Sequence, residues 1–328
     1  MRHSIRIQHI DVLRAIAILL MFYAHLVPHY VDIGEEVHFF ERLLSSLAAP
    51  IFLFLVGYNF SPSISLKKQM KRVIVILIYA CLIDMFIWGI YPFYSFDVLY
   101  TIGLSLVFLQ LISRGTIAFK IALLLILLVI MLLIWKFNFY ELSVDEPYLG
   151  ESYNAFNVLF NLVINGWFPL LPWLIFPLLG YLAKDINFNH KIVGVSGGIT
   201  FLIMLYLFQN TVFGTRPFAV EIFYPAGLVY LLISISWLAI LWSTKGFFDN
   251  SVFKFLNPLG KGSFFLYGLH LLCYHLFADQ LIKLGLHKWQ LFLLFILVFY
   301  FISLMLESLK TKWPSYANYQ ILKVIFGG

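Results

Sequence analysis

The chain of 328 residues is too apolar for an ordinary soluble domain, since 62% of its residues are hydrophobic and only 12% are charged. The interior of a soluble domain of this size could not enclose so much apolar surface. The formal net charge of +6 is spread over short polar breaks, with no basic domain outside the apolar runs, which excludes a nucleic-acid-binding protein. We therefore expect an integral membrane protein whose first partner is the lipid bilayer.

Apolar runs alternate with polar breaks along the whole chain, and several approach the roughly 20 residues that cross about 30 Å of hydrocarbon. The pattern predicts an all-α, polytopic membrane protein with about ten transmembrane helices. The predicted spans lie near residues 10–29, 43–61, 73–92, 97–113, 116–135, 161–183, 192–208, 221–243, 263–283 and 289–306. Three prolines in the sixth span, Pro169, Pro172 and Pro177, predict a helix that starts late or is kinked.

The distribution of basic residues predicts the orientation of the chain, because cytoplasmic loops collect Lys and Arg. With the N-terminus inside, the outer side receives five of the 22 basic residues, namely Arg42, Lys136, Arg216, Lys283 and Lys288. Arg14 lies within the first span, and the remaining 16 fall on the cytoplasmic side. We therefore expect cytoplasmic N- and C-termini and a multi-pass protein of the plasma or inner membrane.

The polar breaks are too short to fold by themselves, so residues 1–328 are expected to form a single transmembrane domain. Cys81 and Cys273 both fall within spans and match no metal or redox spacing, which indicates packing residues. His29 follows His25 by one helical turn, but no third ligand stands at a spacing diagnostic of zinc. We therefore expect no metal site.

The first span, HIDVLRAIAILLMFYAHLVPHY, carries Asp11, Arg14 and His25. A charge in hydrocarbon costs roughly 2.5–3.5 kcal/mol on insertion scales, so such residues need a reason to be there. At about 100° per residue, the step from Arg14 to His25 returns to within about 20° of one helical face, with His25 about 16 Å along. Asp11 faces the same way. The alternative is that all three lie at the membrane interfaces; three on one face favour a catalytic wall.

His25 is the leading candidate for proton transfer, because an unperturbed imidazole has a pKa of about 6.5. Near the outer end of its span it could act as general base toward an acceptor hydroxyl or amine, or carry an acyl group transiently. Arg14 could bind a phosphate or carbonyl oxygen of a donor, or simply neutralise Asp11. The sequence is compatible with both roles of His25, as a general base and as an acyl carrier.

Four basic residues, Lys67, Lys68, Lys71 and Arg72, stand at the cytoplasmic entrance of the third span. A positive-inside anchor would look the same, but the group also suits a phosphate-rich donor such as coenzyme A. We assign donor binding mainly to Lys68 and Arg72.

Polar residues also lie within later spans. In the ninth span Tyr267, His270 and Tyr274 share a helical face, either as a structural hydrogen-bond network or as part of the pocket, and we include Tyr267 and His270 among the donor-binding candidates. Asp97 is placed to cap the fourth helix, whereas Asp84, deep in the third span, must find a buried partner or stay protonated.

Several segments together resemble a known family. The pattern D-x-x-R with His eleven residues after the Arg, in IDVLRAIAILLMFYAH, resembles the first helix of the transmembrane acyltransferase superfamily. Within it, APIFLFLVGYNFS, FDVLYTIGLSL, FPLLPWLIFPLLGYLAKD and LNPLGKGSFFLYGLH resemble, in this order, segments of bacterial membrane proteins similar to heparan-alpha-glucosaminide N-acetyltransferase. The similarities reach from about residue 7 to residue 275.

This resemblance implies an acetyl-CoA or other acyl-CoA donor on the cytoplasmic side, a saccharide or glycan acceptor on the other side, and an essential first-helix histidine, here His25. Arg14 matches the partner arginine of the Arg-to-His pattern. The stretch from Lys68 to Arg72 resembles the cytoplasmic Arg-rich element of the related membrane O-acyltransferase family 3. The domain would then be a transmembrane acyltransferase domain, with a second copy of the chain as a candidate homodimer partner.

The sequence therefore predicts an acyl-CoA-dependent acyltransferase that moves an acyl group, most simply acetyl, to a hydroxyl or amine of an extracytoplasmic or lipid-linked saccharide. Two other classes stay open. A transporter or flippase of a lipid-linked sugar or small amphiphile could use the same intramembrane charges as a permeation path. A non-enzymatic sensor or structural membrane subunit would tolerate neutral substitutions of Asp11, Arg14 and His25 together.

Overall fold

The computed structural model describes residues 7–31, 39–137, 139, 154–186, 189–209 and 226–313, with single positions beyond. Within these ranges the regular structure is helical and no strand occurs, which confirms the all-α class. The longer helices are α1 (Gln8–Val31), α3 (Ala48–Asn59), α4 (Leu66–Ile83), α5 (Val98–Ile112), α6 (Ile117–Lys136), α9 (Ile175–Asp185), α10 (His190–Gln209), α11 (Leu228–Ser243), α13 (Asn257–Lys283) and α14 (Lys288–Lys312). Shorter elements are α2 (Phe39–Ser46), η1 (Asp84–Trp88), α7 (Ala155–Phe160), η2 (Asn161–Asn165), α8 (Leu170–Trp173), α12 (Lys245–Phe248) and η3 (Ser251–Leu256).

In the described part of the chain, six helical stretches are long and apolar enough to cross a membrane. They are Gln8–Tyr30, Phe40–Asn59, Ile117–Lys136, Ala155–Asp185, His190–Leu207 and Lys288–Lys312, and α5 and α11 are shorter apolar helices. Helices also lie at the other predicted spans, but the count of ten and the orientation of the termini stay predictions. Arg216, part of the charge asymmetry, lies outside the described residues.

Large apolar side chains stand exposed on several of these helices. On α10, Leu202 is 66% exposed, and Ile192, Val195 and Ile199 are exposed as well. On α14, Phe301 and others on its outer face are exposed in the same way. Such continuous apolar surface is unfavourable in water and is satisfied by lipid, which identifies a membrane protein.

The helices form two compact units. One contains Met1–Ala48, His190–Gly198 and Trp237–Gly328, and the other contains Ala49–Asn189 and Ile199–Ser236. We call them the first unit and the second unit. The single transmembrane domain expected over residues 1–328 stays a prediction.

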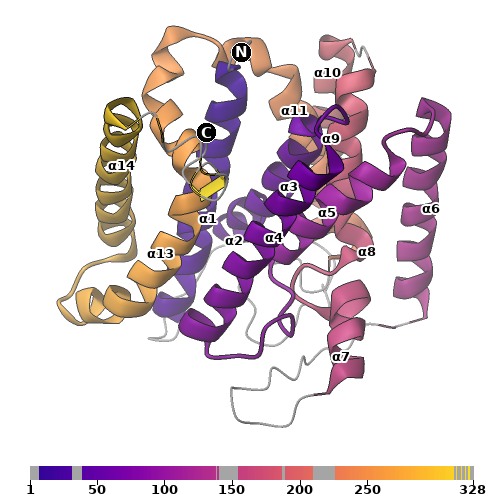
Figure 1. The fold of residues 1–328 in the computed structure, drawn as a ribbon. Coiled ribbons are helices and arrows are strands. Elements are labelled where there is room, and N and C mark those ends of the chain that lie inside the picture. The colour runs from indigo at the N-terminus through magenta and orange to yellow at the C-terminus, as the bar shows by residue number, and fades with distance from the viewer. Residues whose placement is uncertain are drawn as a thin grey trace. The chain divides into compact units, whose positions relative to one another are not determined.

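The first unit is built around the contact between α1 and α13, which run side by side (Figure 1). The two helices approach closely at Gly260, where an added Cβ would overlap the backbone carbonyl of Asp11. Small residues permit such close contacts in membranes, where van der Waals packing replaces the hydrophobic effect between helices. α14 also packs on α1, with the rings of Phe299 and Phe22 at 4.6 Å between centroids. This packing sets which side chains of α1 and α13 meet.

The second unit contains a reciprocal close contact between α3 and α9. An added Cβ at Gly57 would overlap the carbonyl of Pro177, and one at Gly180 would overlap the carbonyl of Phe54. At the end of α9, Lys120 of α6 bonds to Asp185 at 3.1 Å. Close backbone packing and an ion pair thus fix α9 within this unit.

The sixth predicted span is broken, as its prolines predicted. It consists of η2, α8 and α9, with α7 directly before it, and the chain between η2 and α8 pairs with another segment of the second unit. The backbone N–H of Trp167 donates to the carbonyl of Ser95 at 2.8 Å, and that of Phe168 donates to Phe96 at 2.9 Å. The backbone groups released by the break are therefore bonded within the protein, as irregular structure at membrane depth requires.

Candidate active site

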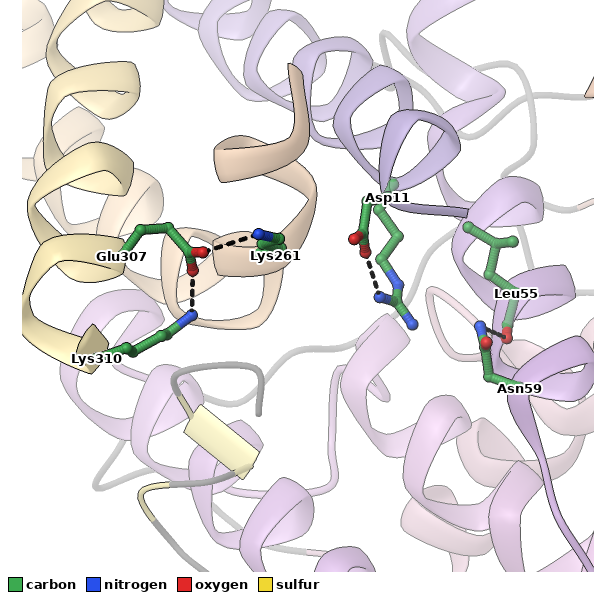
Figure 2. Close-up of polar contacts among 7 residues, drawn as sticks. Asp11, Leu55, Asn59, Lys261, Glu307 and Lys310 are labelled. Atoms are coloured by element: carbon green, nitrogen blue, oxygen red, sulfur yellow. Dashed lines mark hydrogen bonds and ion pairs between the residues drawn. The ribbon is translucent and has the colours of Figure 1, made fainter. Parts of the chain in front are cut away.

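Asp11 and Arg14 form the predicted ion pair one turn apart on α1. Arg14 donates from Nη1 to Oδ1 of Asp11 at 3.0 Å (Figure 2). The Asp11 side chain is 3% exposed, whereas that of Arg14 is 28% exposed. Arg14 is thus the more accessible member of the pair for an anionic or carbonyl oxygen.

A second ion cluster joins α13 to α14 in the same unit. Glu307 accepts from Lys261 at 3.0 Å and from Lys310 at 2.7 Å, and Figure 2 shows Glu307 between the two lysines. Because Lys261 follows the glycine that abuts Asp11, this cluster lies near the end of α1 that carries the Asp11 pair. With both lysines bonded to Glu307, the cluster ties the two helices together.

His25 lies partly exposed on α1 and uses one ring nitrogen for contacts within the protein. Its Nδ1 atom is 3.1 Å from the carbonyl oxygen of Met21 and 3.2 Å from Nε2 of His270. Because a carbonyl oxygen only accepts hydrogen bonds, the network assigns the proton of the neutral ring to Nδ1. Among the described residues, Nε2 of His25 has no hydrogen-bond partner. Its lone pair can therefore take a proton or attack a carbonyl carbon.

His270 is fully buried on α13 beside His25. The ring centroids of Tyr267 and Tyr274 lie 5.7 and 5.5 Å from that of His270, which confirms the predicted shared face. The Tyr274 hydroxyl donates to the carbonyl of Phe22 at 2.8 Å and so ties this face to α1. A role of Tyr267 and His270 in donor binding stays a prediction.

One turn beyond His25, His29 forms a contact that the sequence did not indicate. Its Nδ1 atom lies 2.9 Å from Oδ1 of Asp279 on α13. Single acidic residues near helix ends are common, so the sequence around Asp279 did not predict a contact with His29. His29 and His25 thus both hold Nδ1 against a partner on α13.

Lys68 and Arg72 lie on α4 in the second unit. Lys68 is exposed and Arg72 is partly buried. An ammonium and a guanidinium one turn apart fit the chemistry of a phosphate-bearing ligand, and they equally fit an interfacial anchor. Their predicted role in donor binding is untested by the contacts within this unit.

Asp84 of the second unit has the buried partners that its position demanded. It is fully buried, and its two carboxylate oxygens accept from Tyr100 at 2.5 Å and from Ser95 at 3.0 Å. Asp97 caps α5 as predicted, accepting from the backbone N–H of Val98. Both carboxylate oxygens of Asp84 therefore have hydrogen-bond donors within the second unit, and these bonds tie Asp84 to Ser95 and Tyr100.

No group of three His, Cys, Asp or Glu side chains able to hold a metal ion occurs in the described parts of the chain. The residues that the structure brings together around α1 are instead the Asp11 and Arg14 pair and the two imidazoles of His25 and His270. Imidazoles can transfer protons, and a guanidinium can bind a phosphate.

Comparisons with known proteins assign the family. The family model for the catalytic domain of heparan-alpha-glucosaminide N-acetyltransferase matches residues 6–208, which is more than half of the chain. The matched range includes His25 and Lys68 but ends before Tyr267 and His270. Comparisons with curated proteins and with solved structures gave no match. The chain belongs to the heparan-alpha-glucosaminide N-acetyltransferase catalytic-domain family, an acetyltransferase family of membrane proteins.

Proposed function

We propose that this protein transfers an acetyl group from acetyl-CoA to an amine or hydroxyl of a saccharide. The observation that carries the proposal is the family match over residues 6–208, because it includes the helix that holds His25. The partly exposed ring of His25 and its open Nε2 atom support a direct role in the transfer. Donor, acceptor and mechanism go beyond the family assignment and are part of the proposal.

In the proposed reaction, His25 acts at the acceptor. Nε2 removes the proton from the acceptor amine or hydroxyl as its nitrogen or oxygen attacks the thioester carbonyl. The new C–N or C–O bond forms, the C–S bond breaks, and the imidazolium returns the proton to the departing thiolate. Arg14 lies about 16 Å along α1 from His25, too far to reach the same carbonyl oxygen, and is proposed to bind a phosphate of the donor. Asp11 holds its guanidinium at 3.0 Å.

His25 could also carry the acetyl group itself. In that course Nε2 attacks the thioester, coenzyme A leaves as the thiol, and the acetyl-imidazole is then cleaved by the acceptor. Initial rates measured over a grid of donor and acceptor concentrations distinguish the two courses. Parallel double-reciprocal lines indicate the carrier, and intersecting lines indicate direct transfer.

The donor is proposed to approach Lys68 and Arg72, whose positive charges attract the phosphates of coenzyme A. We propose that the protein lies in the plasma or inner membrane with its N-terminus in the cytoplasm. The N-terminal end of α4 then faces the acyl-CoA of the cytoplasm, and the acceptor glycan lies on the opposite side of the membrane. A homodimer remains part of the proposal.

The direct test uses purified protein in nanodiscs with acetyl-CoA and two matched saccharides. One ends in glucosamine and offers an amine, and the other ends in N-acetylglucosamine and offers only hydroxyls. We expect acceptor-dependent release of the coenzyme A thiol and an added acetyl group in the mass spectrum of the product. The pair of acceptors separates N-transfer from O-transfer.

A transporter would give the opposite pattern in the same preparation. A transporter would neither bind nor consume acyl-CoA, and it would move a lipid-linked sugar or amphiphile across the membrane of proteoliposomes. This result would overturn the acetyltransferase proposal.

A further inference from the structure

The hydrogen bonds of His270 fix where its own proton lies. Its Nδ1 atom is 3.0 Å from the carbonyl oxygen of Leu266, and this oxygen can only accept. The neutral ring of His270 therefore carries its proton on Nδ1 and has a lone pair on Nε2. That lone pair lies 3.2 Å from Nδ1 of His25.

The two imidazoles thus form a chain with one direction. His25 donates from Nδ1 to Nε2 of His270 and to the carbonyl of Met21, while His270 donates from Nδ1 to Leu266. If the bond between the rings ran the other way, Nδ1 of His25 would have to accept, and its contact with the Met21 carbonyl would be lost.

We infer that His270 is a positioning residue that holds His25 with its lone pair on Nε2 and its ring turned toward the reactants. This inference rests on the proposed acyltransferase function. In it, His270 takes the place that a carboxylate holds beside a catalytic histidine in other enzymes, as an acceptor for the proton on Nδ1.

The surroundings of His270 explain why it acts through His25. The ring is 0% exposed, and aromatic rings enclose it: the centroids of Phe22 and Tyr267 lie at 5.2 and 5.7 Å. Both of its nitrogens bond within the first unit, so neither is left for the donor. His25 is the partly exposed member of the couple.

A neutral acceptor suits this place better than a carboxylate would. When Nε2 of His25 takes the acceptor proton, the positive ring still donates from Nδ1 to His270 and Met21 without breaking either bond. A carboxylate in the same apolar enclosure would need its own charged partner while His25 is neutral. The couple therefore supports both protonation states of His25 with one geometry.

The test compares His270→Gln with His270→Phe in the purified full-length protein. The oxygen of Gln can occupy the place of Nε2 and accept from His25, whereas Phe keeps the ring shape but accepts nothing. We expect His270→Phe to lower kcat by about 10–100-fold, the range found when the hydrogen-bond partner that orients a metal-bound histidine is removed, with KM for the donor unchanged. His270→Gln should retain most of the wild-type kcat.

Equal loss in both variants would overturn the inference. A raised donor KM with intact kcat in His270→Phe would overturn it as well, and would assign His270 to donor binding. Thermal unfolding and gel filtration verify that the compared variants are folded.

A second measurement needs no turnover. In 15N-histidine-labelled protein, with His25 assigned from its missing signals in His25→Gln, we expect a protonated Nδ1 and an unprotonated Nε2 in the wild type and in His270→Gln. A proton on Nε2, or averaging between the two tautomers, would contradict the inference even if His270→Phe does not fold. Because no substrate is present, this result stands apart from success or failure of the acyl-transfer assay.

Discussion

Arg14 donates from Nη1 to Oδ1 of Asp11 at 3.0 Å, so two opposite charges share one turn of a membrane-spanning helix. The carboxylate is nearly enclosed and the guanidinium is partly accessible. Their pairing reduces the cost of placing either charge in an apolar environment. It also holds the Arg14 guanidinium against α1, the helix that carries His25.

The pair should therefore matter for stability. We expect Arg14→Gln to lower the free energy of unfolding in mixed micelles by about 1–3 kcal/mol, because it leaves the Asp11 carboxylate without this partner. The loss stays below the about 3–5 kcal/mol of a fully buried pair, since Arg14 is partly exposed. Lys254→Gln, at an exposed lysine of the same unit, is the matched control. Equal stability of Arg14→Gln and wild type would show that the pair contributes nothing.

The contact between α1 and α13 should depend on Gly260. A Cβ there would overlap the backbone carbonyl of Asp11, which cannot move without shifting α1. We expect Gly260→Ala to destabilise the protein by about 1–3 kcal/mol, as overpacking does, and to reduce transfer by displacing His25 from His270. Gly262→Ala serves as control, because its Cβ would lie 3.7 Å from the nearest atom, in Leu266. Identical melting of the two variants would contradict the close packing.

The Asp84 cluster should contribute to stability without taking part in the chemistry. Tyr100→Phe removes the 2.5 Å hydrogen bond to the buried carboxylate. We expect a loss of about 1–3 kcal/mol in unfolding free energy with kcat per folded molecule unchanged. Tyr206→Phe, at a tyrosine 69% exposed, is the control and should melt like the wild type. A fall in kcat without a fall in stability would instead place Tyr100 in the reaction.

The basic residues at the start of α4 should affect donor affinity. We expect the double variant Lys68→Gln, Arg72→Gln to raise KM for acetyl-CoA about tenfold, equivalent to about 1.4 kcal/mol, with little change in kcat. The difference from wild type should shrink as the salt concentration rises, because the attraction is screened. A lower kcat at unchanged KM would argue against donor binding at these positions.

Helix positions followed from the sequence because hydrocarbon requires every backbone polar group to be bonded within a helix. Apolar runs alone therefore located α1, α6 and α14. Interruptions were harder to predict. Prolines marked the break in the sixth span, whereas the π-helical turn Asp84–Trp88 contains no proline and adjoins tertiary hydrogen bonds of Asp84.

The candidate site was predictable residue by residue but not as an assembly. The free-energy cost of placing a polar side chain in hydrocarbon singled out His25 and His270 separately. Their contact joins positions 245 residues apart and depends on how α1 packs on α13. The need of Asp84 for a partner was predictable from burial. The identity of that partner, Tyr100, depends on the packing of α4 with α5, which single-sequence periodicity does not report.

In the proposed reaction, Nε2 of His25 takes the acceptor proton or carries the acetyl group. The most direct measurement is acetyl transfer by His25→Gln beside His275→Gln, a control at an exposed histidine of α13. Both proteins should be equally folded in nanodiscs, as judged by melting temperature. We predict that His25→Gln loses at least about 10²-fold in acceptor-dependent release of the coenzyme A thiol, while His275→Gln matches the wild type. Wild-type turnover by folded His25→Gln would show that the imidazole of His25 takes no part in the transfer.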